Sequence, residues 1–363
     1  MLIFLFILLA IGGIAEWWTL KHGLDKVTYS LTPDRQVVDP GESFSITTVI
    51  ENRKRLPISF IKIKELMPCQ LVFDCEDELN IHRDLEHTQL TSSLYLGARK
   101  SSSRSLSVRL PERGRYFFTG CTMYGGDFIG AGQDVRYISQ NAEVAVCPRP
   151  CRSTELQEVL GGFLGDISVR RFILEDPVLT AGFREYTGRE PFRSISWTQS
   201  ARGQGLMVKQ YDYTAEPSVT VVLNVEYRGD LTREMAEKVE KCYRIARTVC
   251  QTLEDSGVRY DFITNATTAG AWGRWHTLEE GIGERHFATV LEGLARAGYG
   301  RIMSFDRLIA RCMRRSDAGR GRIIITPAML DGYQRSVDRL TALHGSCVRI
   351  ITAEELSEEE ADV

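Results

Sequence analysis

Residues 219–223 read Val-Thr-Val-Val-Leu, and this short run decides the fold that the sequence predicts. An apolar run of this length is typical of a strand that is covered on both faces, as the strands of a parallel sheet are. Apolar side chains then recur at intervals of three and four residues from Met235 to Leu253, which predicts an amphipathic helix closed by Gly257. A strand followed directly by a helix is the repeating unit of a mostly parallel sheet.

The same alternation continues toward the C-terminal end of the chain. Further strands are predicted at 258–264, 322–326 and 348–352, and further helices at 285–297, 305–314 and 328–343. We therefore expect a Rossmann-type parallel sheet with helices on both faces over residues 216–353. The Glu-rich residues 354–363 are expected to form a solvated acidic tail.

Upstream, the hydrophobic pattern changes to short alternating runs broken by turn residues. Phe44, Ile46 and Ile50 alternate with polar side chains, and about seven such runs fill residues 28–150, as in a sandwich of two sheets. A chain of 363 residues is long enough for two domains. We therefore expect an all-β sandwich, a connecting segment at 151–215, and the α/β domain.

The first twenty residues carry an almost unbroken apolar run. Residues 1–20 would reach about 30 Å as a helix, which is sufficient to span a bilayer. No basic start or small-residue cleavage site suggests a signal peptide, and Lys21 and Lys26 follow directly. The pattern predicts an uncleaved transmembrane anchor with the body of the protein in the cytoplasm.

Composition narrows the classes of partner. The net charge of −3 gives no overall basic field, so nucleic acid is not expected as a partner. The nine cysteines show no disulfide framework, which fits reduced thiols. One local exception is a run of arginines near a helix end, where the helix dipole, an acidic partner or a lipid headgroup could each account for the charge; its members are Arg311, Arg314, Arg315, Arg320 and Arg322.

The connecting segment contains the most distinctive sequence in the chain. Residues 184–202 read Arg-Glu-Tyr-Thr-Gly-Arg-Glu-Pro-Phe-Arg-Ser-Ile-Ser-Trp-Thr-Gln-Ser-Ala-Arg. This stretch resembles the signature of the bacterial domain-of-unknown-function family 58, in which an Arg-Glu-Tyr triplet leads, at the same spacing, to an arginine, an Ile-x-Trp and a Ser-Ala-Arg. The matching signature residues are Arg184, Glu185, Tyr186, Arg193, Trp197, Ser200, Ala201 and Arg202.

The resemblance carries several expectations. It implies a von Willebrand factor A-like domain that begins after the signature, in a bacterial cell-membrane protein that works with a MoxR-type AAA ATPase. The residues themselves allow two interpretations. Trp197 could be core while the arginines pair with local carboxylates as an interdomain clamp, or the segment could face a partner protein.

The resemblance also locates a metal site that this sequence does not retain. Many von Willebrand A-like domains hold magnesium with an Asp-x-Ser-x-Ser motif after the first strand. The aligned positions here are Asn224, Glu226 and Arg228, which offer a neutral amide, one carboxylate and a positive charge. Because Mg²⁺ requires several oxygen ligands in octahedral geometry, we expect no metal and no other cofactor.

No catalytic motif stands out. The chain has no phosphate-binding loop and no Gly-x-Ser-x-Gly elbow. His344 and Cys347 are the closest pair that could form a thiol nucleophile and its base, but Cys347 begins an apolar strand and is expected to be buried. We therefore expect a membrane-anchored, non-catalytic adaptor or assembly factor of undetermined oligomeric state. The alternatives are a thiol hydrolase that uses Cys347 and His344, and an extracytoplasmic binding module.

Overall fold

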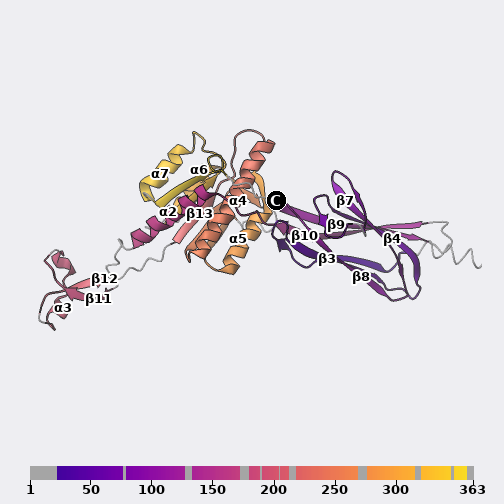
Figure 1. Cartoon of the computed structure of the whole chain (residues 1–363), viewed down its shortest axis with the longest axis horizontal. Coiled ribbons are helices and arrows are strands. Elements are labelled where there is room, and N and C mark those ends of the chain that lie inside the picture. The colour runs from indigo at the N-terminus through magenta and orange to yellow at the C-terminus, as the bar shows by residue number, and fades with distance from the viewer. Residues whose placement is uncertain are drawn as a thin grey trace, which may run out of the picture. The chain divides into compact units, whose positions relative to one another are not determined.

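A computed structural model gives the fold of most of the chain (Figure 1). The structure describes residues 23–76, 79–126, 133–171, 180–188, 190–203, 205–211, 218–268, 276–314, 320–344 and 347–357. The chain divides into two compact units, Met1–Arg149 and Pro150–Val363. Each unit is described by itself.

Two β-sheets build the first unit. The first has the order β1 (Val27–Pro33), β3 (Ser43–Asn52), β8 (Ser101–Arg109) and β5 (Val72–Phe73). The second has the order β2 (Val37–Val38), β10 (Gln133–Val146), β9 (Gly114–Gly126), β4 (Ile58–Pro68), β7 (His87–Leu96) and β6 (Asn80–Arg83). Neighbouring strands are antiparallel except β2 and β10. Inward-facing side chains such as Phe44 and Ile46 of β3 and Ile61 and Ile63 of β4 join in one hydrophobic core.

A carboxylate lies inside this core. Glu65 of β4 is 1% exposed, and its Oε1 accepts hydrogen bonds from the hydroxyls of Tyr29 at 2.8 Å and Thr48 at 2.9 Å. Arg104 of β8 forms an ion pair with the other carboxylate oxygen. Burial and the neighbouring carboxylate raise the pKa of Tyr29, so its hydroxyl remains a donor. Glu65 therefore links β1, β3 and β8 of one sheet to β4 of the other.

The second unit contains a five-stranded sheet in the order β16 (Thr277–Gly281), β14 (Arg259–Thr264), β13 (Ser218–Leu223), β18 (Gly321–Thr326) and β19 (Val348–Thr352). β13 is parallel to β14 and β18, and β18 is parallel to β19. β16 is antiparallel to β14. A second, two-stranded antiparallel sheet joins β15 (Ala266–Thr268) to β17 (Ala297–Arg301).

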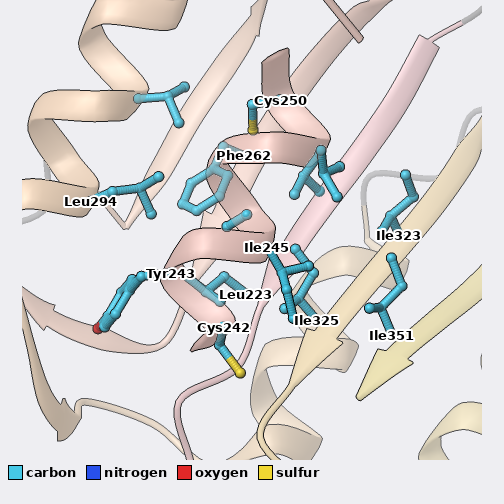
Figure 2. Packing of buried hydrophobic residues seen from close by; sticks show 14 of the residues in the cluster. Leu223, Cys242, Tyr243, Ile245, Cys250, Phe262, Leu294, Ile323, Ile325 and Ile351 are labelled. Atoms are coloured by element: carbon cyan, nitrogen blue, oxygen red, sulfur yellow. The ribbon is translucent and has the colours of Figure 1, made fainter. Parts of the chain in front are cut away.

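Helices cover both faces of the five-stranded sheet. On one face pack α2 (Thr154–Arg171), α4 (Arg233–Asp255) and α5 (Glu284–Arg296). Cys242, Ile245 and Cys250 of α4 share one buried cluster with Leu223, Phe262 and Ile325 of the sheet (Figure 2). On the other face pack α6 (Phe305–Met313) and α7 (Gln334–His344). The Thr232 hydroxyl caps α4 by accepting a hydrogen bond from the Met235 amide.

The predicted fold class is wrong. The described chain has more strand than helix, and its sheets are several and partly mixed, so the described residues do not form a Rossmann-type, von Willebrand A-like fold. A physical reason lies at the edge of the five-stranded sheet. Parallel neighbours need a crossover connection, but the chain returns from β14 through β15 to β16, and β16 therefore pairs antiparallel.

The predicted membrane localisation is also corrected. In the described part of the chain, no helix has both the length and the apolar character needed to cross a membrane. The longest, α4, has 23 residues, but exposed charged side chains such as Arg233 and Glu237 line one side of it. Residues 1–20, where the sequence predicts the anchor, lie outside the described residues.

Removal of the Arg104 charge should destabilise the first unit. Arg104→Gln leaves the buried carboxylate of Glu65 without its cation, so we expect the free energy of unfolding to fall by about 3 kcal/mol. Native-state hydrogen exchange of the β4 amides measures this change. Arg53→Gln is the matched control, because Arg53 and Glu51 form an exposed pair whose loss should cost less than about 1 kcal/mol. Equal losses in the two variants would contradict the assignment.

Candidate functional site

The signature residues lie in a small hairpin, residues 180–211, which we call the signature hairpin (Figure 1). Its strands β11 (Thr180–Glu185) and β12 (Met207–Tyr211) are antiparallel. The connection contains the short helices η1 (Phe192–Ser194) and α3 (Trp197–Ser200). Ile195 pairs with Val208 of β12, and both side chains are buried. These two residues form the small apolar centre of the hairpin.

Ser200 holds α3 to β12. Its hydroxyl donates to the Ser196 carbonyl at 2.8 Å and accepts from the Met207 amide at 2.8 Å. The Ser196 amide donates to the Met207 carbonyl at 2.8 Å, and the Tyr186 amide donates to the Leu206 carbonyl at 2.8 Å. The serine of the Ser-Ala-Arg motif therefore has a structural role inside the hairpin, because its hydroxyl is occupied as both donor and acceptor.

Arg184 has a local carboxylate partner. Its guanidinium lies 2.6 Å from Glu190, whose carboxylate also accepts hydrogen bonds from the Thr187 hydroxyl at 2.8 Å and the Thr187 amide at 3.1 Å. The hydrogen bond from the Thr187 hydroxyl is the main cause that lowers the pKa of Glu190 to about 2, and Arg184 adds to it. This cluster closes the turn between β11 and η1.

Aromatic side chains of the hairpin are exposed. Trp197 is 65% exposed and Phe192 is 72% exposed. Tyr186 contacts Phe192, with ring centroids 6.2 Å apart. The remaining signature residues Glu185, Arg193, Ala201 and Arg202 are exposed as well. The interpretation of Trp197 as a core residue is therefore wrong, whereas Arg184 does pair locally as that interpretation expected.

The three positions aligned with a metal site have different surroundings in the structure, although the Glu226 amide donates to the Asn224 side-chain oxygen at 3.1 Å. Asn224 follows β13 and is fully buried; its amide nitrogen donates to the Thr326 hydroxyl at 2.9 Å, and its oxygen accepts from the Asn265 amide at 2.7 Å. Asn265 also accepts from the Val225 backbone amide at 2.9 Å. Arg228 lies in the loop beyond and is exposed. Asn224, Asn265 and Thr326 thus satisfy one another at the carboxyl ends of β13, β14 and β18.

Glu226 is engaged by protein groups. Its carboxylate accepts a hydrogen bond at 2.5 Å from the Phe305 amide, at the first turn of α6, and forms an ion pair with Arg301. The positive end of the α6 dipole favours this arrangement. Within the described residues, no group of three or more His, Cys, Asp or Glu side chains is placed to hold a metal ion. That the protein binds no metal at these positions stays a prediction.

The sequence does not show that these residues form one polar network. Asn265 and Thr326 come at the ends of β14 and β18, as Asn224 does for β13, so the strand order brings the three together. The only signal in the sequence is a polar residue directly after each apolar run. This signal indicates a shared polar network only once the strands are known to be adjacent and parallel.

The candidate thiol nucleophile is buried. Cys347 is 2% exposed, as expected for a packed thiol, while the side chain of His344 lies outside the described residues. Other cysteines are buried too, and burial raises the pKa of the Cys242 and Cys250 thiols. A thiol of raised pKa carries little thiolate near neutral pH.

The pKa of Glu190 offers a test of the hairpin contacts. A carboxyl whose pKa is lowered on folding contributes stability above its unfolded pKa, near 4.5, and this contribution is lost as the pH falls through about 2. Thr187→Val removes the main cause, so we expect the pKa of Glu190 to rise toward 4.5 in a carbon-13 NMR titration of the carboxyl. Thr198→Val, an exposed position in α3, should leave it unchanged. A pKa near 2 in both variants would refute the assignment.

Comparisons with known proteins assign no family. No model of a protein family matches the sequence, and no curated protein matches it. Among solved structures, a CARDB domain from Pyrococcus furiosus is 10% identical, with a TM-score of 0.22, over 33% of this chain and 86% of that one. A cohesin module of a family 33 glycoside hydrolase from Clostridium perfringens is 13% identical, with a TM-score of 0.25, over 33% and 96%. A non-cellulosomal cohesin from Archaeoglobus fulgidus is 13% identical, with a TM-score of 0.24, over 33% and 91%. Likenesses this weak carry no argument about function.

Proposed function

We propose that the protein is a non-catalytic assembly factor, and that the signature hairpin is the surface it presents to a partner protein. The observation that carries this proposal is the exposure of Trp197 and Phe192 on a hairpin whose backbone is held by its own hydrogen bonds. Exposed large apolar side chains in one small element are typical of interaction sites.

The chemistry of the hairpin fits this role. Tryptophan and arginine are the residue types most enriched at the energetic centres of protein interfaces, and Arg193 and Arg202 are exposed in the same hairpin as Trp197. The Ile195 and Val208 pair and the Ser200 bonds fix the hairpin backbone before any partner arrives. A preordered surface loses less conformational entropy on binding than a flexible one.

The resemblance to domain-of-unknown-function family 58 supplies the first partner to test. We propose that the chain is a divergent relative of that family, supported by the eight signature residues at matching spacing. A MoxR-type AAA ATPase encoded by the same genome is then the proposed partner. Oligomeric state plays no part in this proposal.

Replacement of the exposed tryptophan should weaken this association. For Trp197→Ala we expect an at least tenfold weaker Kd for the AAA ATPase in surface plasmon resonance, with an unchanged melting temperature because the side chain is 65% exposed. Tyr95→Ala is the control, since Tyr95 is an aromatic residue of the first unit and is also 65% exposed. Absence of binding by the wild-type chain, or equal loss in both variants, would reject the proposal.

Thiol labelling separates assembly from thiol hydrolysis. Cys347 is buried, so we expect it to react with a maleimide at least a hundredfold more slowly than the exposed Cys75 in the folded protein. Mass spectrometry of the digested, labelled protein gives both rates. Rapid labelling of Cys347 would instead favour a nucleophilic thiol.

A further inference from the structure

Two hollows lie on either side of α6. One, of about 370 Å³, lies between α6 and α7 and includes Asp306, Arg335 and Arg339. The other, of about 460 Å³, lies on the opposite flank of α6 and includes Arg307, Arg311 and Arg314. Ala310 lines both hollows, and it is exposed. We call the two hollows together the α6 groove.

The α6 groove is strongly basic. Five arginines and one aspartate line it, although the chain as a whole has a net charge of −3. Arg307, Arg311 and Arg314 recur at intervals of four and three residues, so they form one stripe along α6. Within the described residues no ion pair links these five arginines to a carboxylate, whereas Arg320 pairs with Asp261 at 3.2 Å and Arg349 with Asp166 at 3.4 Å. The groove therefore offers charge that the described residues do not neutralise.

The arginine cluster expected from the sequence is divided by the fold. Arg311 and Arg314 are exposed in the α6 groove, but Arg320 is 9% exposed and bound to Asp261, and Arg322 is fully buried in β18. Arg315 lies outside the described residues. Arg335 and Arg339 of α7, far along the sequence, take part instead. Packing of α7 beside α6 creates the basic surface, so it could not be seen in the linear sequence.

The floor of the groove is apolar. Ile302 is 46% exposed, and Met303 and Met313 are half-buried beside the arginine stripe. A ligand that satisfies both features must carry several negative charges and an apolar side. Guanidinium groups bind carboxylates with two parallel hydrogen bonds, and methionine side chains adapt to apolar partners. An acidic amphipathic peptide segment has this composition.

Other anionic ligands fit less well. Among the described residues, no aromatic side chain lines either hollow, so these residues offer no stacking platform for the bases of a single-stranded nucleic acid. The described end of the chain's own acidic segment lies on the other face of the sheet. Glu354 pairs with Lys238 of α4, Leu356 packs in the α4 cluster, and the Ser357 amide donates to Glu155 of α2. The described acidic residues of this chain therefore do not occupy the α6 groove.

We propose that the α6 groove binds an acidic amphipathic segment of a partner protein. Its carboxylates lie between the arginines of α6 and α7, and its apolar side chains lie over Ile302, Met303 and Met313. This site is separate in sequence from the signature hairpin and does not depend on it. It gives the protein a second contact surface, in which clustered charge rather than exposed aromatic area selects the partner.

Fluorescence anisotropy with the full chain tests this proposal. The probes are a fluorescein-labelled helical peptide of glutamate and leucine, its counterpart with lysine for glutamate, and a single-stranded DNA of mixed sequence. Of the three probes, we expect only the acidic peptide to bind saturably, and added salt should weaken its binding. The double variant Arg307→Gln and Arg311→Gln, and separately Ala310→Glu, should each weaken binding at least tenfold.

The matched control removes the same charge elsewhere. Arg233→Gln with Arg285→Gln changes two exposed arginines of α4 and α5 and should leave the affinity within twofold. Melting temperatures of all variants verify that they remain folded. Tighter binding of the DNA would overturn the proposal in favour of a nucleic acid. Failure of the acidic peptide to bind, or equal weakening in groove and control variants, would overturn it outright.

Discussion

The second unit depends on the burial of β13 between two layers of helices. Val219, Val221 and Leu223 point into the core beneath α4, and Val222 points into the core beneath α6 and α7. A strand covered on both faces has no access to water along its length, which favours the apolar side chains that fill the buried part of β13 apart from Thr220. Burial of each aliphatic side chain contributes about 1.5–3 kcal/mol, and a strand with five buried residues anchors both helical layers.

Because β13 is buried, a polar side chain at its carboxyl end needs hydrogen-bond partners from the protein. Asn224 is as buried as the strand before it, and a buried amide without partners costs about 1–3 kcal/mol. Thr326 and Asn265 satisfy it from the neighbouring strands. Glu226, two residues on, is occupied by Arg301 and the first turn of α6. The carboxyl edge of the sheet, where open α/β sheets commonly bind ligands, is thus filled with contacts between protein groups.

Elements with a strong hydrophobic pattern could be predicted from the sequence, whereas elements without one were missed. The helix expected from Met235 to Leu253 is α4, and the strand expected at 322–326 lies in β18, because a buried stripe and a buried apolar run are both visible in the sequence. The edge strand β16 was not recognised: its sequence Thr-Leu-Glu-Glu-Gly has little apolar character, and its Glu280 is held by Arg259 and Arg320. α2 was missed because the glycines within it weaken the helical pattern, although Phe163 packs in the core.

The structure around the candidate sites was harder to predict from the sequence than the fold. Spacing identified the signature residues, but it could not show that Ser200 is a structural link or that Trp197 is exposed. Both depend on a hairpin in which, among the residues that the structure describes, Ile195 and Val208 are the buried apolar side chains. A segment that small cannot also enclose a tryptophan.

The packing of α6 and α7 on the sheet also determines where the exposed arginines lie. Arginines next to an edge strand or a loop find carboxylates, as Arg320 does with Asp261, because the sheet brings acidic and basic side chains from distant segments together. α6 and α7 instead turn their apolar stripes toward the sheet and share the outer surface between two arginine rows. Like charges placed side by side repel each other and reduce stability. An anionic partner of the proposed kind would remove that repulsion on binding. The unfavourable electrostatic free energy of the free protein would then favour association.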